Sequence, residues 1–177
     1  MKTQRGFTLI ELLTSLAILG VLAAIAIPNF KKLTVSSSLY NDTNSLMSDL
    51  AIARSEAART GSPVTICMST DGATCSTAAT QWGQRIVFTD SGTIGVVDGT
   101  DKVLRTSMAV SNANNTITGA NVPNTTYITY SSTGQVSGLV YATPATFTVC
   151  RSGYNGTVVS ISVTGRASSA ATAAVCP

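Results

Sequence analysis

The apolar residues divide the chain into a long helical N-terminal part and a later part with the pattern of short strands. Residues 7–27 read FTLIELLTSLAILGVLAAIAI, and Glu11 is the only charged residue among them. A helix of about 20 apolar residues crosses the hydrocarbon core of a bilayer. The run therefore predicts a transmembrane helix, and the basic residues Lys2 and Arg5 ahead of it favour a cytoplasmic N-terminus.

A cleaved secretory signal peptide is the alternative interpretation of this segment. The apolar run is longer than a usual signal-peptide core, and a carboxylate lies near its start. Both features favour a retained anchor.

The helical pattern continues beyond Pro28, where the missing backbone N–H predicts a kink or local melting. A stripe of apolar and small residues then recurs at spacings of four and three: Leu39, Thr43, Leu46, Leu50, Ala53 and Ala57. Gly61 and Pro63 end the pattern. The stripe could form a coiled coil or dock on the chain's own sheet. The small Ala53 and Ala57 favour docking, so we expect one helix of about 50 residues.

After Gly61 the period changes to that of strands separated by Gly, Asn and Ser turns. The candidate strands are residues 64–68, 85–89, 103–105, 127–130, 138–141, 146–151 and 158–164. Residues 152–156, SGYNG, have the composition of a hairpin turn, which would be that of the last hairpin. The pattern predicts an α+β fold with a long helix on an antiparallel sheet or β-sandwich.

The amino-acid composition argues against several classes of function. Only 11% of the residues are charged, and the chain has no His. The absence of His removes the usual base at neutral pH, the Ser-His and Cys-His nucleophile pairs and the commonest zinc ligand. We therefore expect neither an enzyme nor a cofactor or metal site.

Charge is distributed unevenly along the chain. From residue 102 to 177 there is no Asp or Glu, while Lys102, Arg105, Arg151 and Arg166 remain. Such a stretch can attract an anionic partner such as nucleic acid or phospholipid. Scattered cations on a sparsely charged surface are the plainer interpretation.

Glu11 needs an explanation, because a carboxylate in a membrane helix costs about 1–3 kcal/mol unless it has a partner. No basic side chain lies within one helical turn on its C-terminal side. A free α-amino group, created by cleavage just before Phe7, would supply the missing cation in the same chain or a neighbouring one.

Residues 6–13, GFTLIELL, preceded by a short basic leader, resemble the type IV prepilin signature. The resemblance implies cleavage between Gly6 and Phe7 by a prepilin peptidase, followed by N-methylation of Phe7. It also implies that Glu11 pairs with the N-terminus of a neighbouring subunit during assembly.

The prepilin interpretation divides the chain into four segments. Residues 1–6 are the leader, residues 7–28 the transmembrane and assembly helix, residues 29–61 the amphipathic helix, and residues 62–177 the β-rich head. The implied location is the bacterial inner membrane, crossed once, with the head in the periplasm and in the pilus after assembly. The implied partners are other major and minor pilins and the peptidase.

The head carries a second resemblance. Residues 82–90, WGQRIVFTD, are similar to the W-x-x-G-W-I-V-F-x-D stretch of GspH/FimT-type pseudopilins, with Arg85 where that pattern commonly has an aromatic residue. The FTVC strand at 147–150 and the turn at 164–166 also resemble this family. It includes FimT- and FimU-like minor pilins, which implies a structural subunit that initiates or caps a pilus. A minor pseudopilin of a type II secretion system would share these features.

Four cysteines, Cys67, Cys75, Cys150 and Cys176, lie in the part expected to face an oxidising compartment. Three pairings are possible. We favour Cys67–Cys75, which closes a small loop, and Cys150–Cys176, which would hold the Ala-rich tail.

One loop carries candidate metal-binding residues. Asp90, Asp98 and Asp101 could offer oxygen ligands to Ca²⁺, but the spacing is not that of an EF-hand, so we expect an ordinary turn.

Gly165 and Arg166 resemble the start of the Gly-Arg-x-Arg motif of DNA-binding FimT proteins, although Ser168 replaces the second Arg. The candidate DNA-binding residues are therefore Gly165, Arg166, Arg151, Lys102 and Arg105. A Cys150–Cys176 bridge could bring Arg151 close to Arg166. DNA is thus an alternative partner, and a solvated turn is the default.

Overall fold

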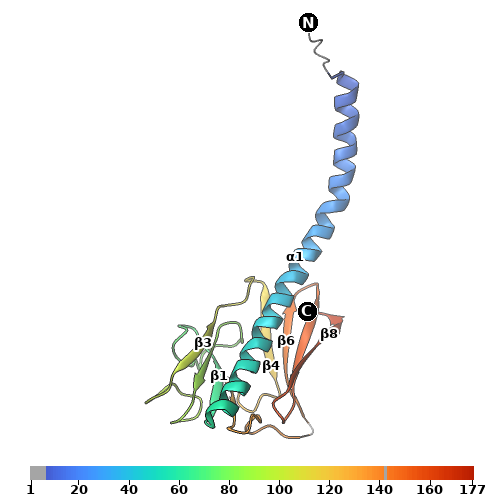
Figure 1. The fold of residues 1–177 in the computed structure, drawn as a ribbon. Helices are drawn as coiled ribbons and strands as arrows, with labels where there is room; N and C mark the ends of the chain where they lie inside the picture. The colour runs from blue at the N-terminus through green and yellow to red at the C-terminus, as the bar shows by residue number, and fades with distance from the viewer. Residues whose placement is uncertain (1–6, 142) are drawn as a thin grey trace. The chain divides into compact units, whose positions relative to one another are not determined.

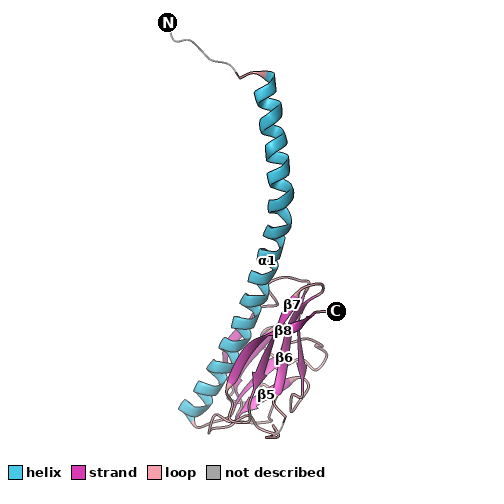
Figure 2. Cartoon of the chain, turned by 90° about the vertical axis from the view of Figure 1, so that its right-hand side faces the viewer, coloured by secondary structure: helices cyan, strands magenta, loops and turns pink. Residues whose placement is uncertain are grey.

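The structure is a computed structural model that describes residues 7–141 and 143–177. Its chain forms two compact units, Met1–Ser37 and Ser38–Pro177. One helix, α1 (Leu9–Thr60), runs through the first unit into the second and is followed by eight strands in the described residues. Figures 1 and 2 show the second half of α1 lying along the sheets of the second unit, which we call the head.

Among the described residues, the first unit contains the N-terminal part of α1. Its apolar side chains between residues 9 and 27 are exposed, as in a helix that requires a nonpolar surrounding. By length and composition, α1 is apolar enough to cross a membrane. The helix is not interrupted at Pro28, so the expected local melting is wrong. A single proline removes one backbone hydrogen bond, and the side-chain amide of Asn29 donates to the carbonyl of Ile25 at 3.1 Å.

In the head, α1 buries the predicted stripe. All six of its residues are at most 4% exposed: Leu39, Thr43, Leu46, Leu50, Ala53 and Ala57. The prediction that this stripe docks on the chain's own sheets is therefore confirmed. The alanines have no exposed surface at all, because their small side chains let the helix backbone approach the strands closely.

Two four-stranded antiparallel sheets face α1. The first has the order β3-β2-β1-β5, with β1 Val64–Met68, β2 Arg85–Thr89, β3 Val103–Ser107 and β5 Tyr127–Tyr130. The second has the order β4-β6-β7-β8, with β4 Asn115–Ala120, β6 Ala145–Arg151, β7 Asn155–Ile161 and β8 Ala167–Val175. The α+β architecture is the one that the sequence predicts.

The core lies between these sheets and the helix. Strands β1 and β2 are buried on both faces, and most of their residues are apolar. Trp82 is 2% exposed and packs edge-on against Phe147, with ring centroids 4.9 Å apart. Trp82 is thus a core residue that connects the segment just before β2 to strand β6 of the second sheet.

One predicted strand is absent, and two strands were not predicted. Residues 138–141 form no strand: the backbone of Gly138 has φ 76°, and Val140 and Tyr141 are exposed. Strands β4 and β8 were not expected, because the Asn, Gly and Ala in β4 and the many Ala residues in β8 give a weak strand signal. Cross-strand pairing stabilises both strands, β4 with β6 and β8 with β7.

The last hairpin is also placed differently from the prediction. Residues 152–154 connect β6 to β7, and the last hairpin is formed by β7 and β8. Its turn is closed by Ser162, whose N–H donates to the carbonyl of Arg166 at 3.0 Å. The Ala-rich tail is therefore an edge strand.

Candidate functional site

The N-terminal site begins at Phe7, and Gly6 lies outside the described residues. Thr8 precedes the first residue of α1 and forms a reciprocal cap with Glu11. The N–H and Oγ1 of Thr8 donate to Oε2 of Glu11 at 3.0 and 2.9 Å, and the N–H of Glu11 donates back to Oγ1 of Thr8 at 3.3 Å. This is a capping box, which satisfies two N–H groups of the first helical turn.

The capping box orients the Glu11 carboxylate toward the start of the helix. Both donated bonds reach Oε2, and no described residue donates to Oε1. A carboxylate in this position lies next to the positive end of the helix dipole and can accept a further hydrogen bond from a cation. Sequence reasoning identified the need for a partner but missed Thr8, although the T-x-x-E spacing was visible.

A second polar cluster is buried where α1 meets the first sheet. Asp49 has no exposed surface and binds Arg85, which is 1% exposed, through Nε at 2.9 Å and Nη2 at 2.6 Å. Arg105 lies 2.8 Å from the other carboxylate oxygen, and Ser107 donates to both oxygens. The remaining guanidinium nitrogen of Arg85 donates to the carbonyl of Trp82 at 2.5 Å.

This cluster accommodates Arg85 at a position where the similar sequence pattern commonly has an aromatic residue. Its guanidinium is surrounded by acceptors, so a buried charge is paired and hydrogen-bonded. Asp49 is the residue from which this pair could have been predicted. It is a carboxylate on the buried face of the helix, and a buried carboxylate requires a cation from the sheet. Nearby, Asp42 accepts from the N–H of Ser111 at 2.7 Å and from Nδ2 of Asn115 at 2.6 Å.

The cysteines form two disulfides, Cys67–Cys75 and Cys150–Cys176, which are the pairs that the sequence favours. The second disulfide joins the end of β6 to the residue after β8. The Asp90 loop is internally bonded: Asp101 accepts from the N–H of Ser91, and Asp98 from the N–H of Thr93. In the described residues, no group of three potential ligands is placed to hold a metal ion.

The candidate DNA-binding cations are not brought together. Arg105 is bound to Asp49, and the guanidinium of Arg151 lies 5.9 Å from the ring centre of Tyr154. Arg166 lies just before β8, whereas Arg151 lies next to the disulfide that follows the end of β8. The expectation that the Cys150–Cys176 bridge brings Arg151 close to Arg166 is therefore wrong, because the bridge joins the far end of the strand.

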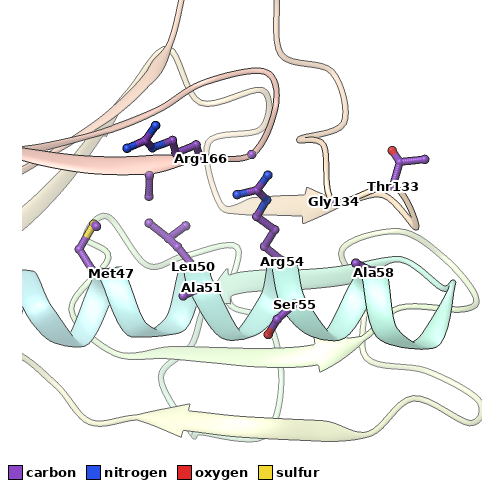
Figure 3. A pocket seen from close by; sticks show the side chains of 11 residues that line it. Met47, Leu50, Ala51, Arg54, Ser55, Ala58, Thr133, Gly134 and Arg166 are labelled. Atoms are coloured by element: carbon purple, nitrogen blue, oxygen red, sulfur yellow. The ribbon is translucent and has the colours of Figure 1, made fainter.

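Arg166 instead lines a groove between α1 and the turns that precede β8. The groove has a volume of about 500 Å³. Met47, Leu50, Ala51, Ser55 and Ala58 form its helical side together with Arg54, as Figure 3 shows. Thr133, Gly134, Gly165, Arg166 and Ala167 form the other side. Sequence reasoning found Arg166 but not Arg54, because only the packing of α1 places the two arginines in one groove.

Comparison with known proteins agrees with this architecture. Residues 42–165 match the family model for the type II transport protein GspH, and residues 1–27 match the prokaryotic N-terminal methylation motif. The fold is similar to that of the Pseudomonas aeruginosa type IV minor pilin FimU, with a TM-score of 0.58. That match has 24% identity and covers 77% of this chain and 90% of FimU.

Curated relatives match over a short segment. A fimbrial protein of Pseudomonas aeruginosa is 54% identical over 39 residues, which are 22% of this chain and 25% of the relative. The type IV major pilin protein PilA of Myxococcus xanthus is 67% identical over 34 residues, 19% of this chain and 16% of that protein. The match thus spans a quarter or less of each curated relative.

The GspH model matches more than half of the chain, and the methylation motif covers the start of its apolar helix. Both features fit a membrane-anchored pilin, and pilins and pseudopilins are structural subunits rather than enzymes. The chain belongs to the GspH family of type IV pilin-like proteins.

Proposed function

We propose that this protein is a minor pilin, a structural subunit that helps to initiate or cap a type IV pilus. The N-terminal site carries the proposal. In this proposal, Phe7 becomes the methylated N-terminus after cleavage between Gly6 and Phe7. The Glu11 carboxylate then forms an ion pair with the N-terminal amine of a neighbouring subunit. Thr8 supports this role, because its two donors orient the carboxylate while Oε1 has no described donor.

The proposal places the N-terminal part of α1, up to residue 28, in the inner membrane with the head in the periplasm before assembly. It makes a prepilin peptidase and other pilins the partners of the protein. The apolar surface of residues 9–27 and the two disulfides of the head support this topology. Burial of the apolar helix among neighbouring helices would offset its exposure when the subunit leaves the bilayer.

Two measurements test the proposal. Mass analysis of the mature protein should find an N-methylated Phe7 as the first residue; an intact Met1 or cleavage near residue 28 would contradict it. Glu11→Ala should leave the protein in the membrane but reduce its incorporation into filaments, whereas Thr14→Ala, on the next turn, should not. Equal incorporation of both variants would exclude the pairing role of Glu11.

A pseudopilin of a type II secretion system is the second candidate, and the GspH family match favours it. The two candidates differ in the filament that takes up the subunit. Deleting the gene should abolish surface pili if the first is correct and secretion of folded substrates if the second is correct.

A DNA-binding minor pilin for DNA uptake is the third candidate. Its support is confined to the exposed Arg166 next to Gly165, since Arg105 is engaged by Asp49 and Arg151 lies elsewhere on the second sheet. Retention of DNA that falls steeply with salt and is lost in Arg166→Ala would favour this candidate.

A further inference from the structure

The groove lined by Arg54 and Arg166 combines two cations with apolar residues, and the proposed pairing through Glu11 does not involve it. Arg54 comes from α1 and Arg166 from the β7–β8 turn, and Figure 3 shows both side chains at the same groove. In the described part of the chain, neither guanidinium makes a hydrogen bond or an ion pair with another side chain. Arg59, on the same helix, differs because it binds Glu56. Two unpaired guanidiniums in one groove favour an anionic occupant.

The wall of the groove is closely packed at the point where the two turns meet. A Cβ on Gly165 would overlap the carbonyl oxygen of Gly134 and lie 3.0 Å from the ring of Tyr130. The side chain of Arg54 in turn packs on Gly134, where a Cβ would lie 3.4 Å from its Cγ. The contact between these turns therefore fixes the side of the groove on which Arg54 rests, and Arg166 directly follows Gly165.

The floor of the groove is apolar. Met47, Leu50, Ala51 and Ala58 supply it from the helix, and no acidic residue lines it. A suitable occupant thus combines a negative charge, held by the arginines, with an adjoining apolar group on the floor. An Asp or Glu side chain next to an aliphatic side chain has this chemistry.

The acidic side chains of the chain itself are all buried or hydrogen-bonded within the chain. Its eight acidic residues are all described, and each is either buried or already engaged. Asp42, Asp49 and Asp90 are buried. The other five accept hydrogen bonds from their own neighbourhoods: Glu11 from Thr8, Glu56 from Arg59, Asp71 from Ala73 and Thr74, Asp98 from Thr93, and Asp101 from Ser91. A second copy of this chain is therefore a poor occupant, and a different protein is favoured.

Nucleic acid fits the groove less well than an acidic protein segment. Polymers of phosphate are held by a track of several cations, and each phosphate contact adds to the affinity. Here Arg105 is held by Asp49 and Arg151 is placed near the far end of β8, so the groove presents only Arg54 and Arg166.

We propose that the Arg54–Arg166 groove is a heterotypic docking site that binds an Asp or Glu side chain, flanked by an apolar residue, of a different protein. That this protein is another pilin subunit rests on the proposed function. The groove would thus select a neighbour of a different sequence, while the N-terminal site would pair subunits through the Glu11 carboxylate.

The experiment uses the full-length protein in a zwitterionic detergent. The probe is a short blocked peptide with Glu between two leucines, compared with the same peptide containing Gln. Titration is followed by NMR of the arginine Nε–Hε groups. The Glu peptide should shift the signals of Arg54 and Arg166, and the Gln peptide should not. Arg54→Gln and Arg166→Gln should each raise the dissociation constant by about threefold to tenfold, through loss of a charge-assisted hydrogen-bonding partner.

Arg59→Gln is the matched control, because it removes a charge from the same helix outside the groove, and it should leave binding unchanged. All three arginines are exposed, so we expect each variant to fold like the wild type. An unchanged backbone NMR spectrum would verify this. Equal binding of the Glu and Gln peptides would overturn the proposal, as would an Arg59 effect as large as those of the groove variants. Tighter binding of single-stranded oligothymidylate through the same two arginines would also overturn it in favour of nucleic acid. If the wild-type protein binds the Glu peptide but does not enter filaments, the result counts only against the proposed function.

Discussion

Asp49 and Arg85 form a buried ion pair between α1 and the first sheet, with Oδ2 of Asp49 2.6 Å from Nη2 of Arg85 and both side chains at most 1% exposed. Arg85 also binds the carbonyl of Trp82, so the pair links the helix to the residue that packs on the second sheet. The polar cluster thus joins all three layers of the head at one point.

Asp49→Ala should destabilise the head by about 3–5 kcal/mol, because it leaves the Arg85 guanidinium buried without its counterion. Urea unfolding can be followed by the fluorescence of Trp82, the only Trp in the chain. The double variant Asp49→Leu, Arg85→Met removes both charges and should recover much of the loss. Arg59→Ala, which breaks an exposed pair, is the control and should leave the unfolding midpoint unchanged. A midpoint for Asp49→Ala equal to that of the control would contradict this role.

Gly165→Ala should destabilise the head through a steric clash. Gly165 has φ 78°, and an added Cβ would overlap the carbonyl of Gly134. Gly153 is the matched control, since it has φ 80° but no atom within 4 Å of its Cβ position. Gly153→Ala should cost only the backbone strain of about 1–2 kcal/mol, and Gly165→Ala should cost more. Thermal unfolding measures both, and equal losses would show that the Gly134–Gly165 contact can relax.

Removing the Cys150–Cys176 disulfide should cost more stability than removing Cys67–Cys75. The two bridges close segments with sequence separations of 26 and 8 residues. The chain-entropy model then gives about 3.5 and about 2.5 kcal/mol. Paired Cys→Ser variants and urea unfolding measure this order. Hydrogen exchange should also quicken most in β8, because the longer bridge holds the residue that follows this edge strand.

Asp90 should make stability depend on pH. Burial raises its pKa above the ordinary value of 3.8, although Oδ2 accepts from Thr65 and Gly95. The folded state therefore keeps this proton at a pH where the unfolded chain has lost it. The contribution of Asp90 to stability falls as the pH rises from 3.8 to the raised pKa and is constant above it.

Asp90→Asn remains neutral throughout that range. The stability of this variant relative to the wild type should therefore increase with pH across the window and then level off. Urea unfolding at a series of pH values measures the difference, which isolates Asp90 from the other carboxyl groups. Asp71→Asn serves as the comparison, because hydrogen bonds from Thr74 and Ala73 lower the pKa of this exposed carboxyl and its pH dependence has the opposite sign. A flat difference for Asp90→Asn would show that its carboxyl titrates normally.

The sequence by itself determined the features that depend on neighbouring residues. The apolar run of residues 7–27 and the stripe from Leu39 to Ala57 follow from local periodicity, as does the alternation in β6. The short β-branched runs of β1, β2 and β5 are also local signals. The GFTLIELL signature is likewise contiguous, and the cysteine spacing favoured the two pairs that are formed.

Only the tertiary structure decided the features that join distant segments. The β4 and β8 sequences have weak strand propensity and become strands because β6 and β7 supply hydrogen-bonding partners. Asp49 and Arg85 are 36 residues apart, and no local pattern indicates that they meet. Arg54 and Arg166 share a groove because the helix packs beside the β7–β8 turn. The sequence determines which side chains are charged, but the packing of the layers determines the partner of each buried charge.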